Sequence, residues 1–192
     1  MYLLNKKSGM TLTELLVSSM LVGIIITGAL SSDYAIRTWQ KRIEERILTQ
    51  MDLTIALEVI VKYGWSAVGT GVNEGTTLDF GAAINYYKDS LWEYIGFTQS
   101  DGTIVVFFHD IDDSVYLTRY DTVPSGEHIF DDPTFLKISD PDFFDLNFDA
   151  DGKLQSVKIT LTTRFAPSLT EGSLDNQDFT LETSFLPPGL SQ

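Results

Sequence analysis

The stretch Ser8-Gly9-Met10-Thr11-Leu12-Thr13-Glu14-Leu15-Leu16 places one carboxylate, that of Glu14, at the start of a long apolar segment. The sixteen residues from Leu15 to Leu30 carry no charge. With the residues on either side, the apolar span over 10–31 reaches the length of about 20 residues that a membrane-spanning helix needs. A carboxylate inside a bilayer costs about 2.5–3.5 kcal/mol on insertion scales, so we expect Glu14 to have a partner.

The helical pattern continues beyond the apolar span. Apolar residues recur every three or four positions, at Ile36, Trp39, Ile43, Ile47, Met51, Ile55 and Val59. Charged residues lie between them, mostly from Arg37 to Arg46. This spacing predicts an amphipathic helix over 32–63 that continues the helix over 10–31. We expect it to end near Tyr63-Gly64, because glycine is the usual residue just past a helix.

The remaining residues, 64–192, have the pattern of a globular β-rich head. Strand-like runs separated by Gly, Pro and Asp turn signals lie at 103–109, 114–120, 143–148, 154–163 and 178–185. Residues 64–103 are rich in Gly, Asn, Thr and aromatic residues and allow no firm assignment. The predicted fold class is α+β, with the transmembrane and amphipathic halves of one long N-terminal helix followed by an antiparallel β-sheet head packed on the amphipathic half.

Charge is divided unevenly along the chain. Residues 1–50 carry 6 Lys/Arg and 4 Asp/Glu, a net charge of +2, whereas residues 51–192 carry 7 Lys/Arg and 23 Asp/Glu, a net charge of −16. We expect no nucleic-acid partner, because phosphate-backbone binding needs a basic surface. The absence of cysteine excludes disulfides, cysteine-based zinc sites and thiol nucleophiles.

Two plain interpretations account for Glu14 or for the apolar segment. Thr11 and Glu14 fit the T-x-x-E capping box, with Thr11 as the N-cap of the helix. Residues 1–29 also fit a secretory signal peptide, with Lys6-Lys7 before the apolar region and a cleavage site near Ala29. The protein would then be a secreted β-rich binding domain.

A third interpretation uses more of the residues. Cleavage between Gly9 and Met10 would create an α-amino group on Met10 and leave Glu14 as the fifth residue of a membrane helix. The terminal ammonium of a neighbouring subunit could then pair with the Glu14 carboxylate. Such a pair would neutralise both charges within the membrane and fix the axial register between subunits.

At these residues the sequence resembles the type IV pilin and pseudopilin family. The family motif is a short basic leader ending in Gly, followed by an apolar residue, Thr, Leu, any residue, Glu and a long apolar run. Here Lys6-Lys7-Ser8-Gly9 precedes Met10-Thr11-Leu12-Thr13-Glu14. The resemblance implies that prepilin peptidase cuts after Gly9 and methylates Met10, and that Glu14 is the assembly glutamate.

The resemblance also implies an organisation and a location. Residues 1–9 would be the leader, 10–31 the transmembrane and assembly helix, 32–63 the amphipathic half of the helix, and 64–192 the head. The chain would sit once in the cytoplasmic (inner) membrane with its head in the periplasm or outside the cell. It would then join other subunits in a type IV pilus or a type II secretion pseudopilus. The late strands look like those of W-type minor pilins or J-type minor pseudopilins.

Residues 147–152 resemble the first half of a calcium-binding loop. Asp149 and Asp151 occupy ligand positions and Gly152 the glycine position, but Lys158 stands where a bidentate Glu belongs. A plain Asp-Gly hairpin turn explains the same residues. We therefore expect no metal and no cofactor, with calcium at Asp149 and Asp151 as the alternative.

Catalysis is not expected, because no nucleophile elbow, phosphate loop or catalytic pair is present. The acids at 110, 112 and 113, next to His109, are interpreted as a solvated hairpin tip and not as metal or acid/base groups, and Glu127-His128 as a loop. A membrane-tethered hydrolase that uses Asp110 or Asp149 is the enzymatic alternative. The aromatic residues of 86–94 are assigned to the sheet core, with a sugar or partner platform as the other possibility.

Overall fold

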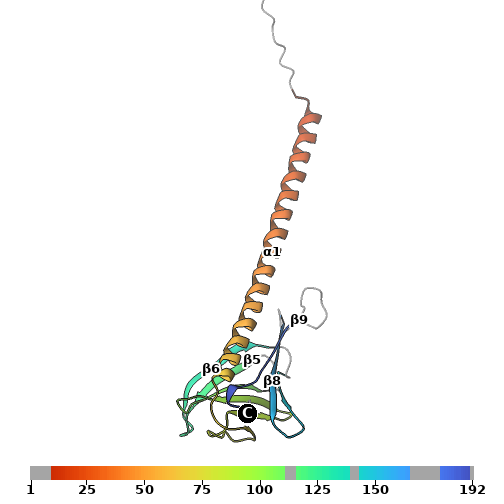
Figure 1. Ribbon diagram of the computed structural model, residues 1–192. Helices are drawn as coiled ribbons and strands as arrows, with labels where there is room; N and C mark the ends of the chain where they lie inside the picture. Colours follow the sequence, from red (N-terminus) through yellow and green to blue (C-terminus); the bar gives the residue numbers. More distant parts are fainter. Residues whose placement is uncertain (1–9, 111–115, 139–142, 165–177, 191–192) are drawn as a thin grey trace, which may run out of the picture. The chain divides into compact units, whose positions relative to one another are not determined.

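The computed structural model describes residues 10–110, 116–138, 143–164 and 178–190 (Figure 1). The chain divides into two compact units, residues 1–45 and 46–192, and each is described by itself. A single helix, α1 (Leu12–Trp65), contributes to both units, and the second unit also contains the strands. The long N-terminal helix followed by a mostly antiparallel β-sheet head confirms the predicted α+β class.

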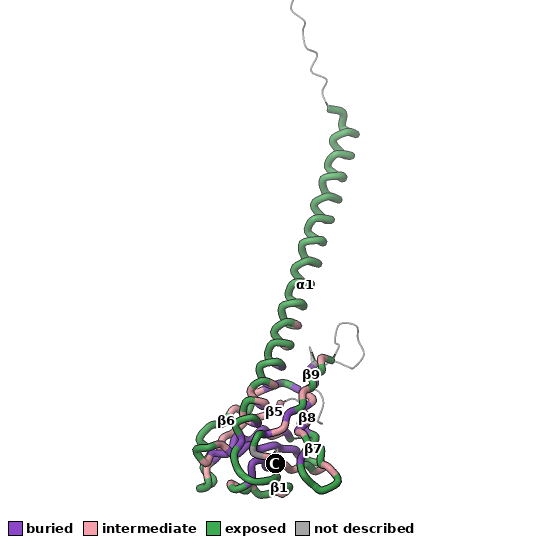
Figure 2. The backbone as a smooth tube through the Cα atoms, in the orientation of Figure 1, coloured by how far each residue is buried: buried purple, intermediate pink, exposed green. Residues whose placement is uncertain are grey.

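Almost every residue of α1 in the first unit is exposed (Figure 2). By length and composition, α1 is able to cross a membrane. Its polar side chains bond to the helix itself: the Ser19 hydroxyl donates to the carbonyl of Leu16 at 2.8 Å, and the Thr27 hydroxyl to that of Gly23 at 2.8 Å. These bonds satisfy hydroxyl groups that would otherwise be costly in lipid.

The buried face of α1 differs from the predicted one. In the second unit Leu53, Ala56, Ile60 and Gly64 are buried, and their spacing of three and four residues is that of one helix face. The predicted stripe includes Met51 and Ile55, whose side chains remain 56% and 46% exposed. The amphipathic pattern correctly predicted a helix, but it did not identify the buried face: of the predicted stripe, Val59 packs on the main core, whereas Met51 and Ile55 stay exposed.

Sheet A has six strands, in the spatial order β1 to β6. Their bounds are β1 (Val72–Glu74), β2 (Ile84–Lys88), β3 (Trp92–Thr98), β4 (Ile104–Asp110), β5 (Tyr116–Thr122) and β6 (His128–Lys137). Strands β1 and β2 pair in parallel, and all the other pairs are antiparallel. Consecutive antiparallel pairing follows from the short connections between the strands.

Sheet B has three antiparallel strands, β7 (Phe144–Phe148), β8 (Leu154–Arg164) and β9 (Asp178–Phe185), in that order. A short 3-10 helix, η1 (Pro188–Leu190), follows β9. In β8, Val157, Ile159 and Leu161 are fully buried, which confirms the alternation seen in the sequence.

The five predicted strands correspond to β4, β5, β7, β8 and β9. The sequence did not reveal β1, β2 and β3, which lie in the unassigned region, or β6. The loop interpretation of His128 is wrong, because His128 begins β6. Strand β6 also contains Pro133, which a strand at the edge of a sheet tolerates because one row of its backbone groups is unpaired there.

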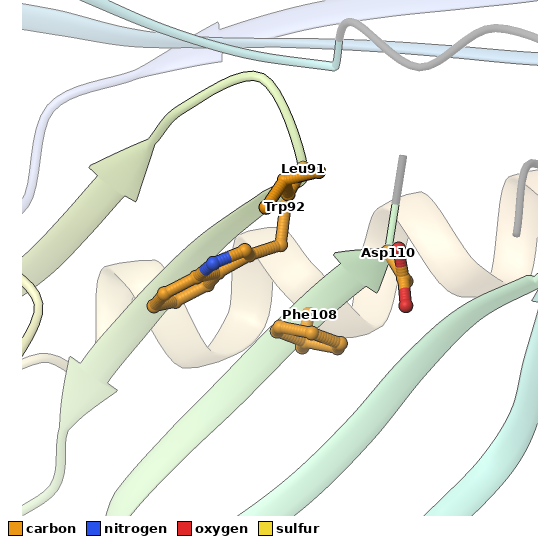
Figure 3. A pocket seen from close by; sticks show the side chains of 4 residues that line it. All are labelled: Leu91, Trp92, Phe108 and Asp110. Carbon is orange, nitrogen blue, oxygen red and sulfur yellow. The ribbon is translucent and has the colours of Figure 1, made fainter. Parts of the chain in front are cut away.

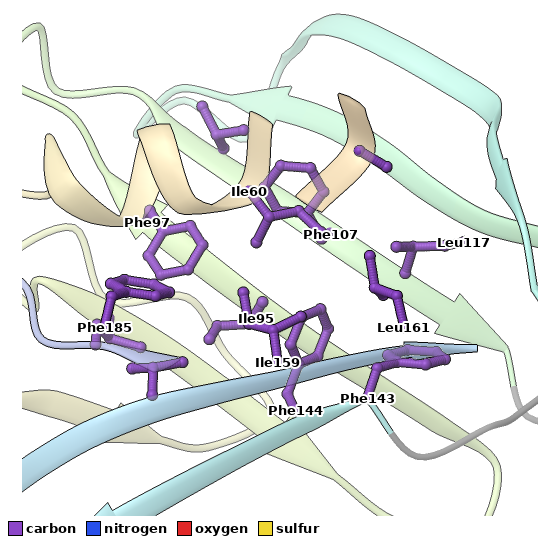
Figure 4. Close-up of a cluster of buried hydrophobic side chains, with 14 of the residues drawn as sticks. Ile60, Ile95, Phe97, Phe107, Leu117, Phe143, Phe144, Ile159, Leu161 and Phe185 are labelled. Carbon is purple, nitrogen blue, oxygen red and sulfur yellow. The ribbon is translucent and has the colours of Figure 1, made fainter. Parts of the chain in front are cut away.

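The main core lies in the second unit, among the last turns of α1, sheet A and sheet B (Figure 4). Ile60 comes from α1, Phe97 and Phe107 come from sheet A, and Ile159 and Leu161 come from sheet B, and all five are fully buried. Burial of side chains of this size stabilises by about 1.5–3 kcal/mol each. Both sheets therefore pack against one face of the last turns of α1.

Gly64 has a different role from the predicted one. It lies inside α1 and has no left-handed φ, so it is not the residue that caps the helix. A Cβ atom placed on Gly64 would lie 2.1 Å from the Phe185 ring, which packs on the helix at this point. Glycine is needed here for close approach to the end of β9 and not for its backbone freedom.

Candidate functional site

The candidate site is the beginning of α1. The backbone N–H of Thr11 donates to Glu14 Oε2 at 2.8 Å, and the N–H of Glu14 donates to Thr11 Oγ1 at 3.3 Å. The Thr11 hydroxyl also donates to Glu14 Oε2 at 2.9 Å. These reciprocal bonds form the predicted capping box and satisfy N–H groups that a helix end leaves without partners.

The capping box is compatible with cleavage of the chain between Gly9 and Met10. All of its groups belong to Thr11 and Glu14, which lie after the Gly9–Met10 bond. The amide between Met10 and Thr11 survives a cut before Met10, so the mature helix could begin in the same way. Gly9 itself lies outside the described residues, and the roles of Gly9, Met10 and Glu14 stay predictions.

Side chains around the site are open to partners. Met10, Leu12 and Leu15 are 62%, 79% and 59% exposed. Further along α1, Gly23 and Gly28 have no atom within 4 Å of an added Cβ. Small residues on an apolar helix allow another helix to approach closely. The geometry therefore suits packing of this segment against other helices within a membrane or a filament.

A comparison with protein-family models bears directly on this segment. The family described as the prokaryotic N-terminal methylation motif matches residues 4–30. The chain is type IV pilin-like. The match supports the type IV pilin and pseudopilin family, and the pilin-like segment contains Gly9, Met10 and Glu14. No curated protein and no solved structure matches the chain.

The head of this pilin-like chain carries the turn at Asp149. The N–H of Asp149 donates to the Lys153 carbonyl at 2.9 Å, and Gly152 has a φ of 76°. Asp149 Oδ1 accepts N–H bonds from Lys153 at 2.8 Å and Asp151 at 3.0 Å, and Oδ2 accepts one from Gln155 at 3.1 Å. The carboxylate thus stabilises a hairpin turn. This agrees with the Asp-Gly turn that the sequence predicted.

The described residues contain no group of three or more His, Cys, Asp or Glu side chains that could hold a metal ion. The backbone bonds, that from Lys153 first, lower the pKa of Asp149. Calcium at Asp149 and Asp151 stays the alternative prediction.

The predicted strand over 103–109 places His109 before the hairpin tip, and the structure confirms this position. His109 is fully buried in β4, where it pairs in register with the fully buried Glu93 of β3. Its ring packs edge-on against Phe143 at 4.8 Å. Glu93 Oε1 accepts a bond from the Tyr86 hydroxyl at 3.3 Å. Asp110 is exposed at the end of β4, and Asp112 and Asp113 lie outside the described residues.

Aromatic residues of 86–94 divide between the two faces of sheet A. Tyr86 lies on the main-core side, where its hydroxyl donates to the Phe144 carbonyl at 3.3 Å. Tyr87, Trp92 and Tyr94 belong to a second, smaller cluster on the other face. The sequence did not reveal this second apolar face. Successive side chains of a strand point to opposite faces, so residues can be assigned to a face only when the bounds of the strand are known.

Proposed function

We propose that this chain is a minor pilin or pseudopilin subunit that is cleaved after Gly9 and assembled into a type IV pilus or a type II secretion pseudopilus. The observation that carries the proposal is the methylation-motif match at 4–30, which contains a leader ending in Gly and a glutamate five residues further on. The role is structural. The late strands support a minor subunit through their resemblance to W-type and J-type chains.

The chemistry of the first turn supports an assembly role for Glu14. A carboxylate in lipid needs a cation or hydrogen-bond donors. In the single chain the donors are the N–H and hydroxyl of Thr11. A neighbour's Met10 ammonium would add a full opposite charge to the same carboxylate. Such a pair forms only between two chains. The Glu14 carboxylate would therefore be neutralised within the membrane only when one subunit is added next to another.

The proposed location follows from the same segment. An apolar helix able to cross a membrane supports a single-pass anchor in the inner membrane. The acidic head, with a net charge of −16 over 51–192, suits an aqueous compartment away from anionic lipid. We place the head in the periplasm or outside the cell, with prepilin peptidase and other pilin-type subunits as partners.

The decisive experiment is N-terminal sequencing and intact-mass measurement of the protein recovered from its native membrane. The proposal predicts a start at Met10 with one added methyl group. A matched Gly9→Ala variant should keep its leader, because the peptidase would lose the residue before the cut. A start near Leu30 would indicate a signal peptide and a secreted binding domain, and an intact Met1 would contradict processing altogether.

A further inference from the structure

The face of sheet A that is turned away from the main core carries a pocket of about 370 Å³, lined by Leu91, Trp92, Phe108 and Asp110 (Figure 3). Trp92 of β3 pairs in register with Asp110 of β4, and Phe108 lies two residues before Asp110. The three side chains therefore stand on one face of the sheet, and the pocket joins two aromatic rings to a carboxylate.

The Trp92 ring and the turn before it are held by their neighbours. The centroid of the Trp92 ring lies 4.6 Å from that of Tyr87 and 5.9 Å from that of Phe108. The Tyr87 hydroxyl donates to Asp89 Oδ2 at 3.1 Å, and Asp89 Oδ1 accepts the N–H of Trp92 at 2.9 Å. The rings are therefore in place before a ligand arrives, so binding costs little conformational entropy.

The chemistry of the pocket selects its ligand. Aromatic faces attract cations, and the exposed Asp110 carboxylate adds an opposite charge at the same place. A guanidinium group is planar, so it can stack on a ring, and its fork of N–H donors matches both oxygen atoms of a carboxylate, whereas a lysine ammonium is a compact point charge. A neutral sugar would use the rings but gain nothing from the acidic head. We propose that the pocket binds an arginine side chain.

The arginine belongs to a different protein, one with a net positive charge. The head, residues 64–192, carries 6 Lys/Arg against 21 Asp/Glu, a net charge of −15, so it attracts a basic partner and repels a second head. Arg119 in the head bonds to Asp121 at 3.0 Å, and its side chain is 15% exposed. A free small molecule fits less well, because its sites usually enclose about 70–90% of its surface, whereas Leu91 at this pocket is 53% exposed.

Partner binding goes beyond the filament function and does not depend on it. The last turns of α1 pack on the other face of sheet A, through Leu53, Ala56 and Ile60 of the main core. A partner at the pocket therefore contacts the head without disturbing that packing. The N-terminal mass tests processing of the subunit, and the pocket is tested by binding.

The test uses the full-length chain, labelled with 5-fluorotryptophan, in non-ionic detergent micelles. Its three tryptophans, Trp39, Trp65 and Trp92, give fluorine NMR signals that single Trp→Phe variants assign. The probe is the peptide acetyl-Lys-Gly-Arg-Gly-Lys-amide. We expect the peptide to move the Trp92 signal until the site is saturated and to leave the other two signals in place. Movement of all three signals alike, or of none, would overturn the pocket as the site.

Three control ligands separate charge, shape and source. A peptide with citrulline in place of the arginine keeps the shape without the charge, and one with a central lysine keeps the charge without the planar group. Each should bind about two- to fivefold more weakly than the arginine peptide. Methylguanidinium, which lacks the peptide, should bind more weakly than the arginine peptide. Equal affinity of any of the three would overturn, respectively, the charge, the arginine or the protein as the feature that is recognised.

Protein variants test the role of the carboxylate. Asp110→Asn should weaken binding of the arginine peptide about two- to fivefold, because an exposed ion pair is lost. Asp131→Asn is the matched control: Asp131 is exposed on β6 and pairs with Tyr120 of the second cluster, which places it on the same face of sheet A. It should leave binding unchanged. Both changes are at exposed positions, so folding should be kept. Equal effects of the two variants would overturn Asp110 as part of the site.

Dilution of the labelled chain without peptide tests whether the partner is a different protein. The Trp92 signal should stay in place as the chain is diluted, because the acidic heads repel each other. A Trp92 signal that moves on dilution would show that a second copy occupies the pocket, and would overturn a different protein as the partner.

Discussion

Single aspartates set the turns of the head. Asp89 accepts the N–H groups of Leu91 and Trp92, Asp101 accepts that of Thr103 at 2.9 Å, and Asp149 accepts that of Lys153. Backbone hydrogen bonds to the ionised form lower the pKa of all three carboxyl groups. The geometry of each turn therefore depends on the negative charge of its aspartate.

The consequence is a loss of stability in acid. In the unfolded chain these carboxyl groups titrate at about pH 3.9, and in the folded chain they titrate lower. Their contribution is therefore fully present above about pH 4 and is lost as the pH falls through the folded pKa values. In thermal unfolding, Asp149→Asn should lower the Tm of the head at pH 7, and the deficit should shrink below about pH 4.

Asp145→Asn, in β7 and outside the turn, is the matched control for this measurement. It should show no comparable pH-dependent deficit. A constant deficit of Asp149→Asn from pH 7 down to pH 2.5 would show that the charge of Asp149 does not stabilise the turn.

At the scale of elements, the contact between α1 and β9 decides how closely the helix can approach the end of sheet B. Gly64 is the last buried residue of α1, and the Phe185 ring at the end of β9 lies where a Cβ would be. Phe185 in turn packs against Phe97 of β3, with ring centroids 6.0 Å apart. The helix and both sheets therefore meet at one aromatic ring.

Gly64→Ala should destabilise the head by about 1–3 kcal/mol, because an added methyl group overpacks the core while the gain in helix propensity recovers only about 1 kcal/mol. Chemical denaturation of the full chain measures the change. The double variant Gly64→Ala with Phe185→Leu should lose less than the sum of the two single variants, because the smaller side chain makes room. Strict additivity would show that the two residues do not compete for space.

At the scale of the whole molecule, the chain keeps much apolar surface for partners. In the first unit α1 exposes almost its entire surface, and Ile43 and Ile47 continue the exposed apolar residues towards the head. Exposed apolar surface of this extent indicates a protein that functions within a membrane or an assembly. The apolar surface of α1 is therefore available to a membrane or to partner subunits.

Glu14 is expected to control assembly and not folding. Glu14→Gln should leave the Tm of the head and cleavage before Met10 unchanged, while filament incorporation, measured by shearing and immunoblotting, should fall at least tenfold. Glu44→Gln, which removes a carboxylate elsewhere on α1, should assemble normally. Normal incorporation of Glu14→Gln would reduce Glu14 to a capping residue, since Gln keeps a capping-box acceptor.

The sequence by itself determined the features that depend on neighbouring residues. The motif at Gly9–Glu14, the capping box at Thr11, the apolar span and strands such as β4 and β8 follow from spacing, charge and hydrogen bonding over a few positions. Tertiary structure decided the rest. It determined which face of α1 is buried, why residue 64 is glycine, that His109 lies in the core, and that Trp92 and Asp110 share a pocket. These features depend on residues far apart in the chain, whose proximity is set by packing between elements and not by local pattern.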